Sequence, residues 1–377
     1  MNKNYKYYIL IFALSALCFF FIFKGVSLIT NNSIEKQLKA LNYNKQTIEL
    51  IIDYDLTNYL IENDIYSKTL EVALLEGNYI ADNLTDYIYF EYKNYDKYIE
   101  HLNGLKAIGY RNDEINHIFE HLNQNEIDQI IDQTGIIPNL TNYITDQYFD
   151  INNLERYILY KNDNTNYSYE KVINYVNMNL DYNFYEKIEK TKNPDSNIVI
   201  VNKYYYLDKD FIPKNLQSFG TKYAINNDIK ATKPVIDAFI AIANDAKSIN
   251  LTIKVVSGYR SYDSQEAVYK RYVDRDGEEK ANTYSAKPGH SEHQTGLALD
   301  IYNTVLSFSN FEKTVEYAWV KNNAHRYGFI VRYPLNKEDI TGYKYEPWHI
   351  RYVGEEIATY IYENNITFDE YYAKFLK

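Results

Sequence analysis

The feature that most restricts how this chain can fold is an apolar run near its N-terminus. Residues 7–29 are almost entirely apolar apart from Lys24, and a run of this length is long enough to cross a bilayer. Lys3 and Lys6 precede the run, and basic residues favour the cytoplasmic side of a membrane. We therefore expect residues 1–30 to form a cytoplasmic tip and a transmembrane anchor, with everything after about Asn31 on the extracellular side. The alternative is a cleaved signal peptide, which the bulky residues of the run disfavour because they leave no small-residue cleavage site.

The exported part has to be stable without disulfides. Cys18, the one cysteine of the sequence, lies inside the apolar run, so no disulfide or thiolate chemistry is available to the rest of the chain. The formal net charge of −11 argues against nucleic acid as a partner, because phosphate binding requires a concentrated basic surface. A length of 377 residues suits two domains behind the anchor.

Residues 31–190 predict an all-α region. Gly and Pro are scarce there, and apolar residues recur at helical spacing. Two pairs of similar segments, offset by about 65 residues, suggest an internal repeat. In the first pair residues 38–43 resemble 105–110, and in the second residues 78–82 resemble 142–146. No chemistry can be assigned to this region, and we expect a spacer or docking region.

The composition changes near Lys190, and residues 191–377 predict an α+β domain. The pattern predicts strands at 198–201, 251–256, 297–302 and 329–333 and helices at 231–250, 311–327 and 354–365. Together these elements indicate a small antiparallel sheet with flanking helices.

Histidine and carboxylate residues of this second region have the composition of a metal site. Asp300 alternates with apolar residues on a predicted strand, and an unpaired charge in such a place is costly. Catalytic zinc takes three protein ligands and leaves one position for water, and His293, Asp300 and His349 form such a set. Glu346, three residues before His349, is placed to take a proton from the water. His290 is an alternative to His293 as the ligand.

Four segments resemble the VanY family of D-alanyl-D-alanine carboxypeptidases, whose relatives include L,D-carboxypeptidases. They are 257–261 (Ser-Gly-Tyr-Arg-Ser), 288–300 (Pro-Gly-His-Ser-Glu-His-Gln-Thr-Gly-Leu-Ala-Leu-Asp), 328–334 (Gly-Phe-Ile-Val-Arg-Tyr-Pro) and 340–349 (Ile-Thr-Gly-Tyr-Lys-Tyr-Glu-Pro-Trp-His). The resemblance covers roughly residues 198–361, and the region before it has no counterpart.

This resemblance implies one zinc ion per chain on His293, Asp300 and His349, with Glu346 as the catalytic base. It also implies that Arg260 stabilises the oxyanion or binds the peptide carbonyl. The substrate it implies is the stem peptide of peptidoglycan, from which a D,D-carboxypeptidase removes the C-terminal D-alanine. Two alternatives stay open at this point, namely an L,D-carboxypeptidase on tetrapeptide stems and a cell-wall-binding module without turnover.

Further candidates have two interpretations each. Ser257, Gln265 and Ser291 either bind substrate or cap turns, and Trp348 either packs in the core or lines the peptide site.

His117 and His121 lie at i and i+4 of a predicted helix, the spacing of metal ligands. No motif with a carboxylate and a base supports them. We therefore expect a solvent-exposed helix face at this position.

Overall fold

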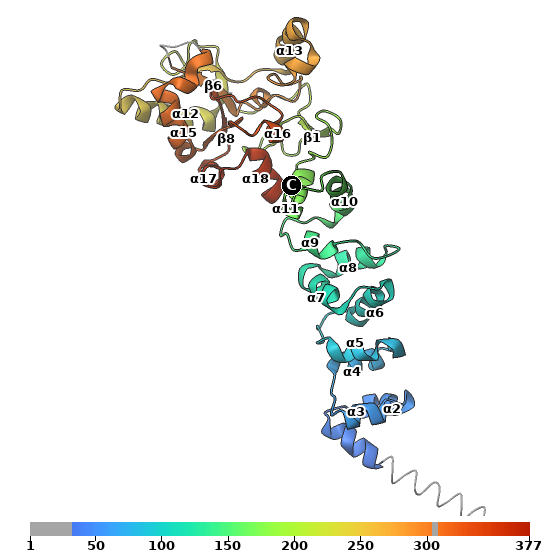
Figure 1. Ribbon diagram of the computed structural model, residues 1–377. Helices are drawn as coiled ribbons and strands as arrows, with labels where there is room; N and C mark the ends of the chain where they lie inside the picture. Colours follow the sequence, from blue (N-terminus) through green and yellow to red (C-terminus); the bar gives the residue numbers. More distant parts are fainter. Residues whose placement is uncertain (1–31, 304–307) are drawn as a thin grey trace, which may run out of the picture. The chain divides into compact units, whose positions relative to one another are not determined.

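The computed structural model describes residues 32–303 and 308–377, which divide into two compact units (Figure 1). The first unit ends at Thr145 and the second begins at Asp146. The predicted transmembrane segment, residues 1–30, lies outside the described residues. Within the described ranges, no helix is long and apolar enough to cross a membrane.

The first unit is built from short helices that pack on one another in succession. They are α2 (Lys45–Asp53), α3 (Thr57–Glu62), α4 (Lys68–Leu75), η1 (Ala81–Asn83), α5 (Leu84–Tyr89), α6 (Tyr98–Ile108), α7 (Asn112–His121), α8 (Gln124–Ile131) and α9 (Leu140–Ile144). Several of these helices begin at a residue whose side chain caps the helix. The side-chain oxygen accepts a hydrogen bond from a backbone amide that has no partner inside the helix. Asn44, Ser67 and Asn123 accept such bonds at the starts of α2, α4 and α8.

The first pair of similar segments has equivalent local structure. Tyr43 and Tyr110 are both buried, and the hydroxyl of each accepts a hydrogen bond from a later backbone amide. The donors are Ser67, at 3.1 Å from Tyr43, and Ile137, at 3.0 Å from Tyr110. This shared contact fixes the loop after each helix in the same way.

The second pair of similar segments does not have equivalent structure, since residue 78 lies in a loop and residue 142 lies in α9. The hydrogen bonds instead relate Tyr87 of α5 to Tyr157 of α10 (Leu154–Asp163). Each accepts from a backbone amide seven residues earlier and donates to an asparagine, at 2.6 Å in both cases. The asparagines are Asn103 and Asn177.

The second unit contains a four-stranded antiparallel sheet in the order β5-β6-β8-β7. Its helices and turns are η2 (Ile151–Asn153), α10, α11 (Tyr169–Asn177), α12 (Lys233–Ser248), α13 (Tyr262–Asp276), α14 (Glu278–Ala281), η3 (Glu292–Thr295), η4 (Phe308–Lys313), α15 (Val315–Asn323), η5 (Ala324–Tyr327), α16 (Glu338–Thr341), α17 (Glu355–Asn364) and α18 (Phe368–Phe375). Its strands are β1 (Glu189–Lys190), β2 (Tyr205–Tyr206), β3 (Leu216–Ser218), β4 (Lys230–Thr232), β5 (Lys254–Ser257), β6 (Ala298–Tyr302), β7 (Phe329–Val331) and β8 (His349–Tyr352).

The predicted antiparallel sheet with flanking helices is confirmed. One apolar cluster joins α12 to the sheet, with Phe239, Leu299, Ile301 and Ile350 all fully buried. A second cluster packs α17 and α18 near β7. The helix predicted at 311–327 is instead divided into η4, α15 and η5.

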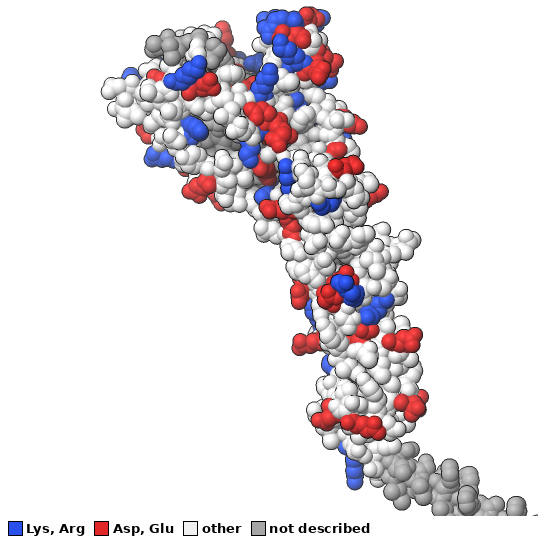
Figure 2. Space-filling model, viewed as in Figure 1, with Lys and Arg blue, Asp and Glu red and all other residues white. Residues whose placement is uncertain are grey.

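Helix α13 was not predicted, because it lacks an apolar stripe of helical period. Gln265 is its one buried residue. Charged side chains of both signs gather on its outer surface (Figure 2), where Lys270 pairs with Asp274 and Arg275 pairs with Asp276.

The prediction of a strand at 198–201 is wrong. The segment is buried as its apolar residues require, but it does not belong to a strand of the sheet. Its backbone carbonyls find side-chain partners instead: Val199 O accepts from the Arg351 guanidinium at 2.7 Å, and Ile200 O accepts from Thr191 at 2.7 Å. A continuous apolar run thus predicted burial correctly and strand pairing incorrectly.

The boundary between the two units differs from the composition change near Lys190. Helix α11 packs on α18, and Lys377 donates a hydrogen bond to Asn177 O at 2.7 Å. Val172, Ile173 and Val176 of α11 are fully buried. Residues 146–190 therefore share contacts with the α+β part of the chain.

We expect a fragment of residues 146–377 to be more stable than one of residues 196–377. The shorter fragment loses the contacts of α18 with α11, and burying one large aliphatic side chain contributes about 1.5–3 kcal/mol. Thermal unfolding followed by circular dichroism should show a Tm lower by roughly 5–10 °C for the shorter fragment. Equal Tm values would contradict a stabilising role for residues 146–195.

Candidate active site

Two of the predicted metal ligands are brought together by the pairing of β6 with β8. Asp300 lies directly opposite His349 in the register of these strands. Side chains alternate between the faces of a strand, so Leu299 and Ile301 enter the core while Asp300 points to the other face. His349 is buried on that same face.

The third predicted ligand, His293, lies in the short helix η3. Its Nδ1 donates to the backbone carbonyl of Gly258 at 2.8 Å, which leaves Nε2 facing Asp300 at 3.3 Å. Residue 258 has to be glycine, because a Cβ there would lie 2.3 Å from the carbonyl oxygen of Lys230. The close packing of Gly258 against Lys230 fixes the position of the Gly258 carbonyl, which orients the His293 ring.

His293, Asp300 and His349 fit a zinc ion. One donor atom from each lies within 4.8 Å of the others, and two imidazoles with a carboxylate are donors that zinc prefers in catalytic sites. Burial disfavours the charged form of Asp300, but His293 and His349 outweigh it and hold the pKa of that carboxyl well below its usual range. His290 is not part of this group of donor atoms. Its Nδ1 donates to Asn202 O at 2.7 Å.

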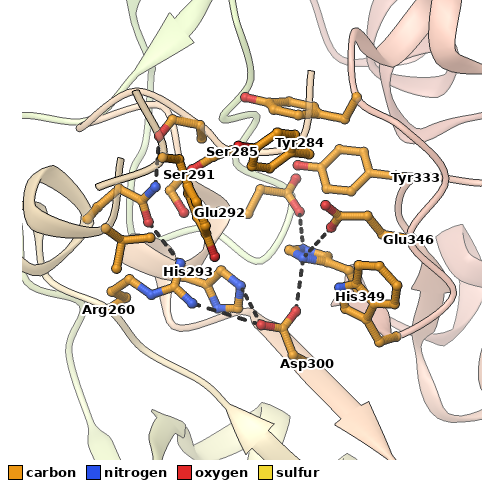
Figure 3. Close-up of a pocket in the computed structure, with 16 residues that line it drawn as sticks. Arg260, Tyr284, Ser285, Ser291, Glu292, His293, Asp300, Tyr333, Glu346 and His349 are labelled. Carbon is orange, nitrogen blue, oxygen red and sulfur yellow. Dashed lines mark hydrogen bonds and ion pairs between the residues drawn. The ribbon is translucent and has the colours of Figure 1, made fainter. Parts of the chain in front are cut away.

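Glu346 lies beside the candidate ligands (Figure 3). Its Oε2 is 3.5 Å from His349 Nδ1, the nitrogen that also faces Asp300 at 3.4 Å. Burial raises the pKa of Glu346 to about 8, with His349 opposing the shift and Asp300 adding to it. A cation on the neighbouring ligands would lower this pKa, because positive charge stabilises a carboxylate.

Arg260 is held at the edge of the group by two of the predicted substrate-binding residues. Its Nη1 donates to Gln265 Oε1 and its Nη2 donates to Ser257 Oγ, both at 2.9 Å. Gln265 in turn donates to Ala286 O at 2.7 Å. Ser257 and Gln265 thus position the guanidinium, which lies 3.9 Å from Asp300.

These residues open onto a cavity of about 380 Å³. Gln265, Ser291 and Trp348 line it, whereas Ser257 is not among the lining residues. The wall also contains four tyrosines that no sequence motif had singled out, namely Tyr272, Tyr284, Tyr333 and Tyr343. Because the chain contains 43 tyrosines, composition alone could not identify these four as residues of a site.

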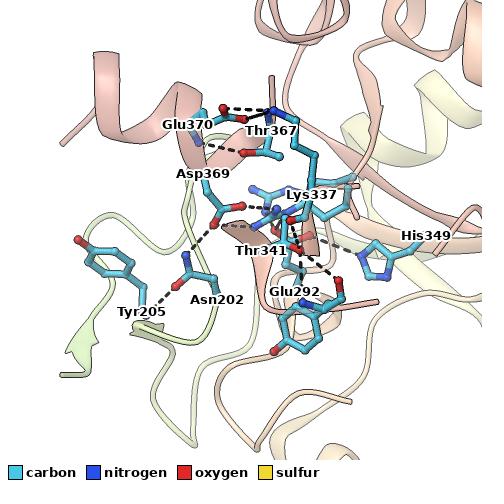
Figure 4. A network of polar contacts seen from close by, with 12 residues as sticks. Asn202, Tyr205, Glu292, Lys337, Thr341, His349, Thr367, Asp369 and Glu370 are labelled. Atoms are coloured by element: carbon cyan, nitrogen blue, oxygen red, sulfur yellow. Dashed lines mark hydrogen bonds and ion pairs between the residues drawn. The ribbon is translucent and has the colours of Figure 1, made fainter. Parts of the chain in front are cut away.

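Glu292 is a buried residue of the site that the sequence analysis did not single out. Its Oε1 accepts from Arg332 at 2.6 Å and from Arg351 at 2.8 Å, and its Oε2 lies 3.5 Å from His349 Nε2 (Figure 4). Burial disfavours its charge, but the two guanidinium groups hold the pKa of Glu292 well below its usual range. The carboxylate therefore faces the ring nitrogen of His349 opposite to the one that faces Asp300.

The charges behind His349 are balanced by a residue of α18. Asp369 accepts from Arg332 at 2.6 Å and from Asn202 at 2.8 Å. Glu292 and Asp369 thus supply two negative charges for Arg332 and Arg351, and all four side chains are almost fully buried. Buried ions require such pairing, because removing one partner leaves an uncompensated charge.

Comparison with known proteins identifies the family of the chain. YodJ of Bacillus subtilis (strain 168), which has a provisional carboxypeptidase name, is 41% identical over 196 residues, covering 50% of this chain and 72% of its own length. The family model VanY, described as D-alanyl-D-alanine carboxypeptidase, matches residues 228–355. The chain belongs to the VanY family. This match includes Arg260, all three candidate ligands and Glu346.

Other relatives match similar shares of this chain. A D-alanyl-D-alanine carboxypeptidase of Enterococcus faecium is 31% identical over 183 residues, 46% of this chain and 57% of its own length. Among solved structures, the LdcB LD-carboxypeptidase is 41% identical over 50% of this chain and 90% of its own, with a TM-score of 0.47. A VanY D,D-pentapeptidase variant in complex with Zn(II) is 30% identical over 46% of this chain and 98% of its own, with a TM-score of 0.41.

We expect Glu292→Gln to weaken zinc binding. The amide can still accept from the arginines but no longer places a negative charge beside His349. Changes to the partners of a metal-ligating histidine typically reduce metal affinity about 10–100-fold. Competition with a chromogenic chelator measures this affinity. The variant should also unfold at lower temperature, because it leaves Arg332 and Arg351 with one carboxylate fewer.

Asp369→Asn is the matched control for Glu292→Gln. It removes a carboxylate from the same arginine but does not touch His349. The control should lose stability and keep its zinc affinity. Equal loss of affinity in both variants would show that Glu292 acts only through stability.

Proposed function

We propose that this chain is a zinc-dependent D,D-carboxypeptidase that removes the C-terminal D-alanine from peptidoglycan stem peptides. The observation that carries the proposal is the buried set of His293, Asp300 and His349, which shares one cavity with Glu346 and Arg260. Membership of the VanY family supports the same reaction. One zinc ion per chain is the cofactor that this donor set fits.

The proposed roles follow from the positions of the side chains. A zinc ion on the three ligands supplies Lewis acidity, which polarises a carbonyl and lowers the pKa of a water molecule. Glu346 takes a proton from the attacking water and delivers it to the nitrogen of the departing D-alanine. A C–O bond forms and the peptide C–N bond breaks, and Glu346 ends the cycle as a carboxylate.

Arg260 supplies a fixed positive charge for the peptide. Its guanidinium is oriented before substrate arrives, because Gln265 and Ser257 already bind it. A preoriented cation stabilises an oxyanion without reorganisation during the reaction. Aromatic side chains such as Tyr284 and Trp348 form part of the cavity wall.

A wall-binding module without turnover is a weaker candidate. Such a module has no need to keep a base beside the ligands, and here Glu346 lies 3.5 Å from His349.

The test incubates the full chain with a pentapeptide stem and a tetrapeptide stem and follows loss of D-alanine by mass spectrometry. We expect cleavage of the pentapeptide, and Glu346→Gln should lower kcat by about 10²–10⁴-fold because an amide cannot accept the proton. Zinc per chain, measured on the same samples, should stay near one for this variant. His293→Ala should lose zinc and activity together.

Each alternative outcome changes a specific assignment. Cleavage of only the tetrapeptide would replace D,D by L,D specificity. Near-normal kcat in Glu346→Gln would remove this residue as the base, and loss of its zinc would make it a ligand. Retention of zinc in His293→Ala would refute the ligand set.

We further propose that residues 7–29 anchor the protein in the cell membrane as a single pass, with the peptidase outside. The support is the apolar run preceded by Lys3 and Lys6. This arrangement brings the enzyme to its extracellular substrate.

Protease added to intact protoplasts should digest the peptidase unit and leave a membrane-bound N-terminal fragment. Digestion of an internal cytoplasmic protein reports lysis and serves as the control. Protection of the peptidase unit, or a mature chain starting near Asn31, would contradict the proposed anchor.

A further inference from the structure

A second group of metal-binding side chains lies on α7 in the first unit. His117, Glu120 and His121 each offer one donor atom, and these atoms lie within 4.8 Å of one another. The two imidazole rings are stacked, with centroids 4.1 Å apart. The group is on the surface, as the sequence predicted, with Glu120 and His121 exposed.

Hydrogen bonding determines which nitrogen of His121 is free to bind a metal. Its Nδ1 lies 2.9 Å from the backbone carbonyl of His117. A carbonyl oxygen only accepts, so Nδ1 of His121 carries the proton. The other nitrogen, Nε2, then has a free lone pair.

The tautomer of His117 is determined in the same way through two threonines. Thr145 Oγ1 donates its proton to Thr141 O at 2.7 Å. The same oxygen lies 2.8 Å from His117 Nε2 and can only accept there, so Nε2 of His117 carries the proton. Nδ1 of His117 is therefore the nitrogen with a lone pair.

Both histidines thus meet the conditions of metal ligands. Metal-ligating histidines generally donate the other ring N–H to a carbonyl, carboxylate or similar acceptor, which fixes the tautomer. Two histidines at i and i+4 of a helix are a known ligand spacing, and the Glu120 carboxylate adds an oxygen donor. Imidazole nitrogen with a carboxylate suits borderline divalent ions such as Zn²⁺, Ni²⁺ and Cu²⁺.

We propose that His117, Glu120 and His121 bind a divalent transition-metal ion at the surface of the helical unit. This site is distinct from His293, Asp300 and His349, and it does not depend on the peptidase activity. Because three protein donors leave coordination positions open, a bound ion can accept a further ligand from outside the chain.

The test titrates metal-free full-length protein with Zn²⁺ in the presence of a competing chelator. Wild type should bind two ions, one of them more weakly. His117→Ala/His121→Ala should bind one ion and keep wild-type peptidase turnover, and His349→Ala should lose the other ion. A single ion in wild type, or two in the double variant, would overturn the proposal.

Thr145→Val tests whether the site is prepared by its hydrogen bonds. Valine has the shape of threonine but cannot accept from His117 Nε2, so we expect the weaker Zn²⁺ site to lose affinity, by up to about 10-fold. Thr141→Val, which leaves the Thr145 hydroxyl in place, is the matched control and should bind like wild type, because its backbone carbonyl is the group that is used. Wild-type affinity in Thr145→Val would refute the argument from the tautomers.

Discussion

The pairing of β6 with β8 controls the position of the peptidase site, because two of the three candidate ligands face each other across it. Asp300 and His349 come from segments far apart in the sequence and meet as directly opposite residues. A slip of one residue in either strand would turn its ligand into the apolar core, since successive side chains alternate between faces. The burial of Leu299, Ile301 and Ile350 against α12 resists such a slip, so hydrophobic packing on one face fixes metal geometry on the other.

A second constraint is electrostatic. The face that carries His349 also carries Arg351, two residues along β8, and both point toward Glu292. Charges buried to this degree are tolerated only when they are paired and hydrogen-bonded. Glu292 accepts from two guanidinium groups with one oxygen and faces the histidine with the other. The packing of the site and the surroundings of a candidate ligand therefore depend on the same carboxylate.

The sequence predicted the parts of the site that lie within short motifs. His293, Asp300, Glu346 and His349 were found because their spacing within two segments has direct chemical meaning. Glu292 stands next to His293 and was missed, because its partners Arg332 and Arg351 are 40 and 59 residues away. Arg332 and Arg351 stand within apolar segments of the sequence, and a buried arginine needs a buried counter-charge. These two residues were therefore the available sign of a buried carboxylate.

The same limit applies to the fold. Apolar periodicity predicted β5, β6, β7, α12 and α17, whereas α13 has no apolar stripe and was missed. The pattern at 198–201 predicted burial, but the sequence could not show that Arg351 would occupy the carbonyl of Val199 in place of a neighbouring strand. A contact between residues so far apart in the sequence cannot be recognised from the local pattern that predicts a strand.

The place of Asp369 in the sequence has a consequence for biosynthesis. Asp369 follows Glu292, Arg332 and Arg351 in the chain, yet it supplies one of the two carboxylates that neutralise the buried arginines. While the ribosome has not yet added α18, Arg332 lacks this counter-ion. The buried charge pairs are therefore completed late in translation, so the peptidase unit reaches its full stability only when nearly all of it has been made.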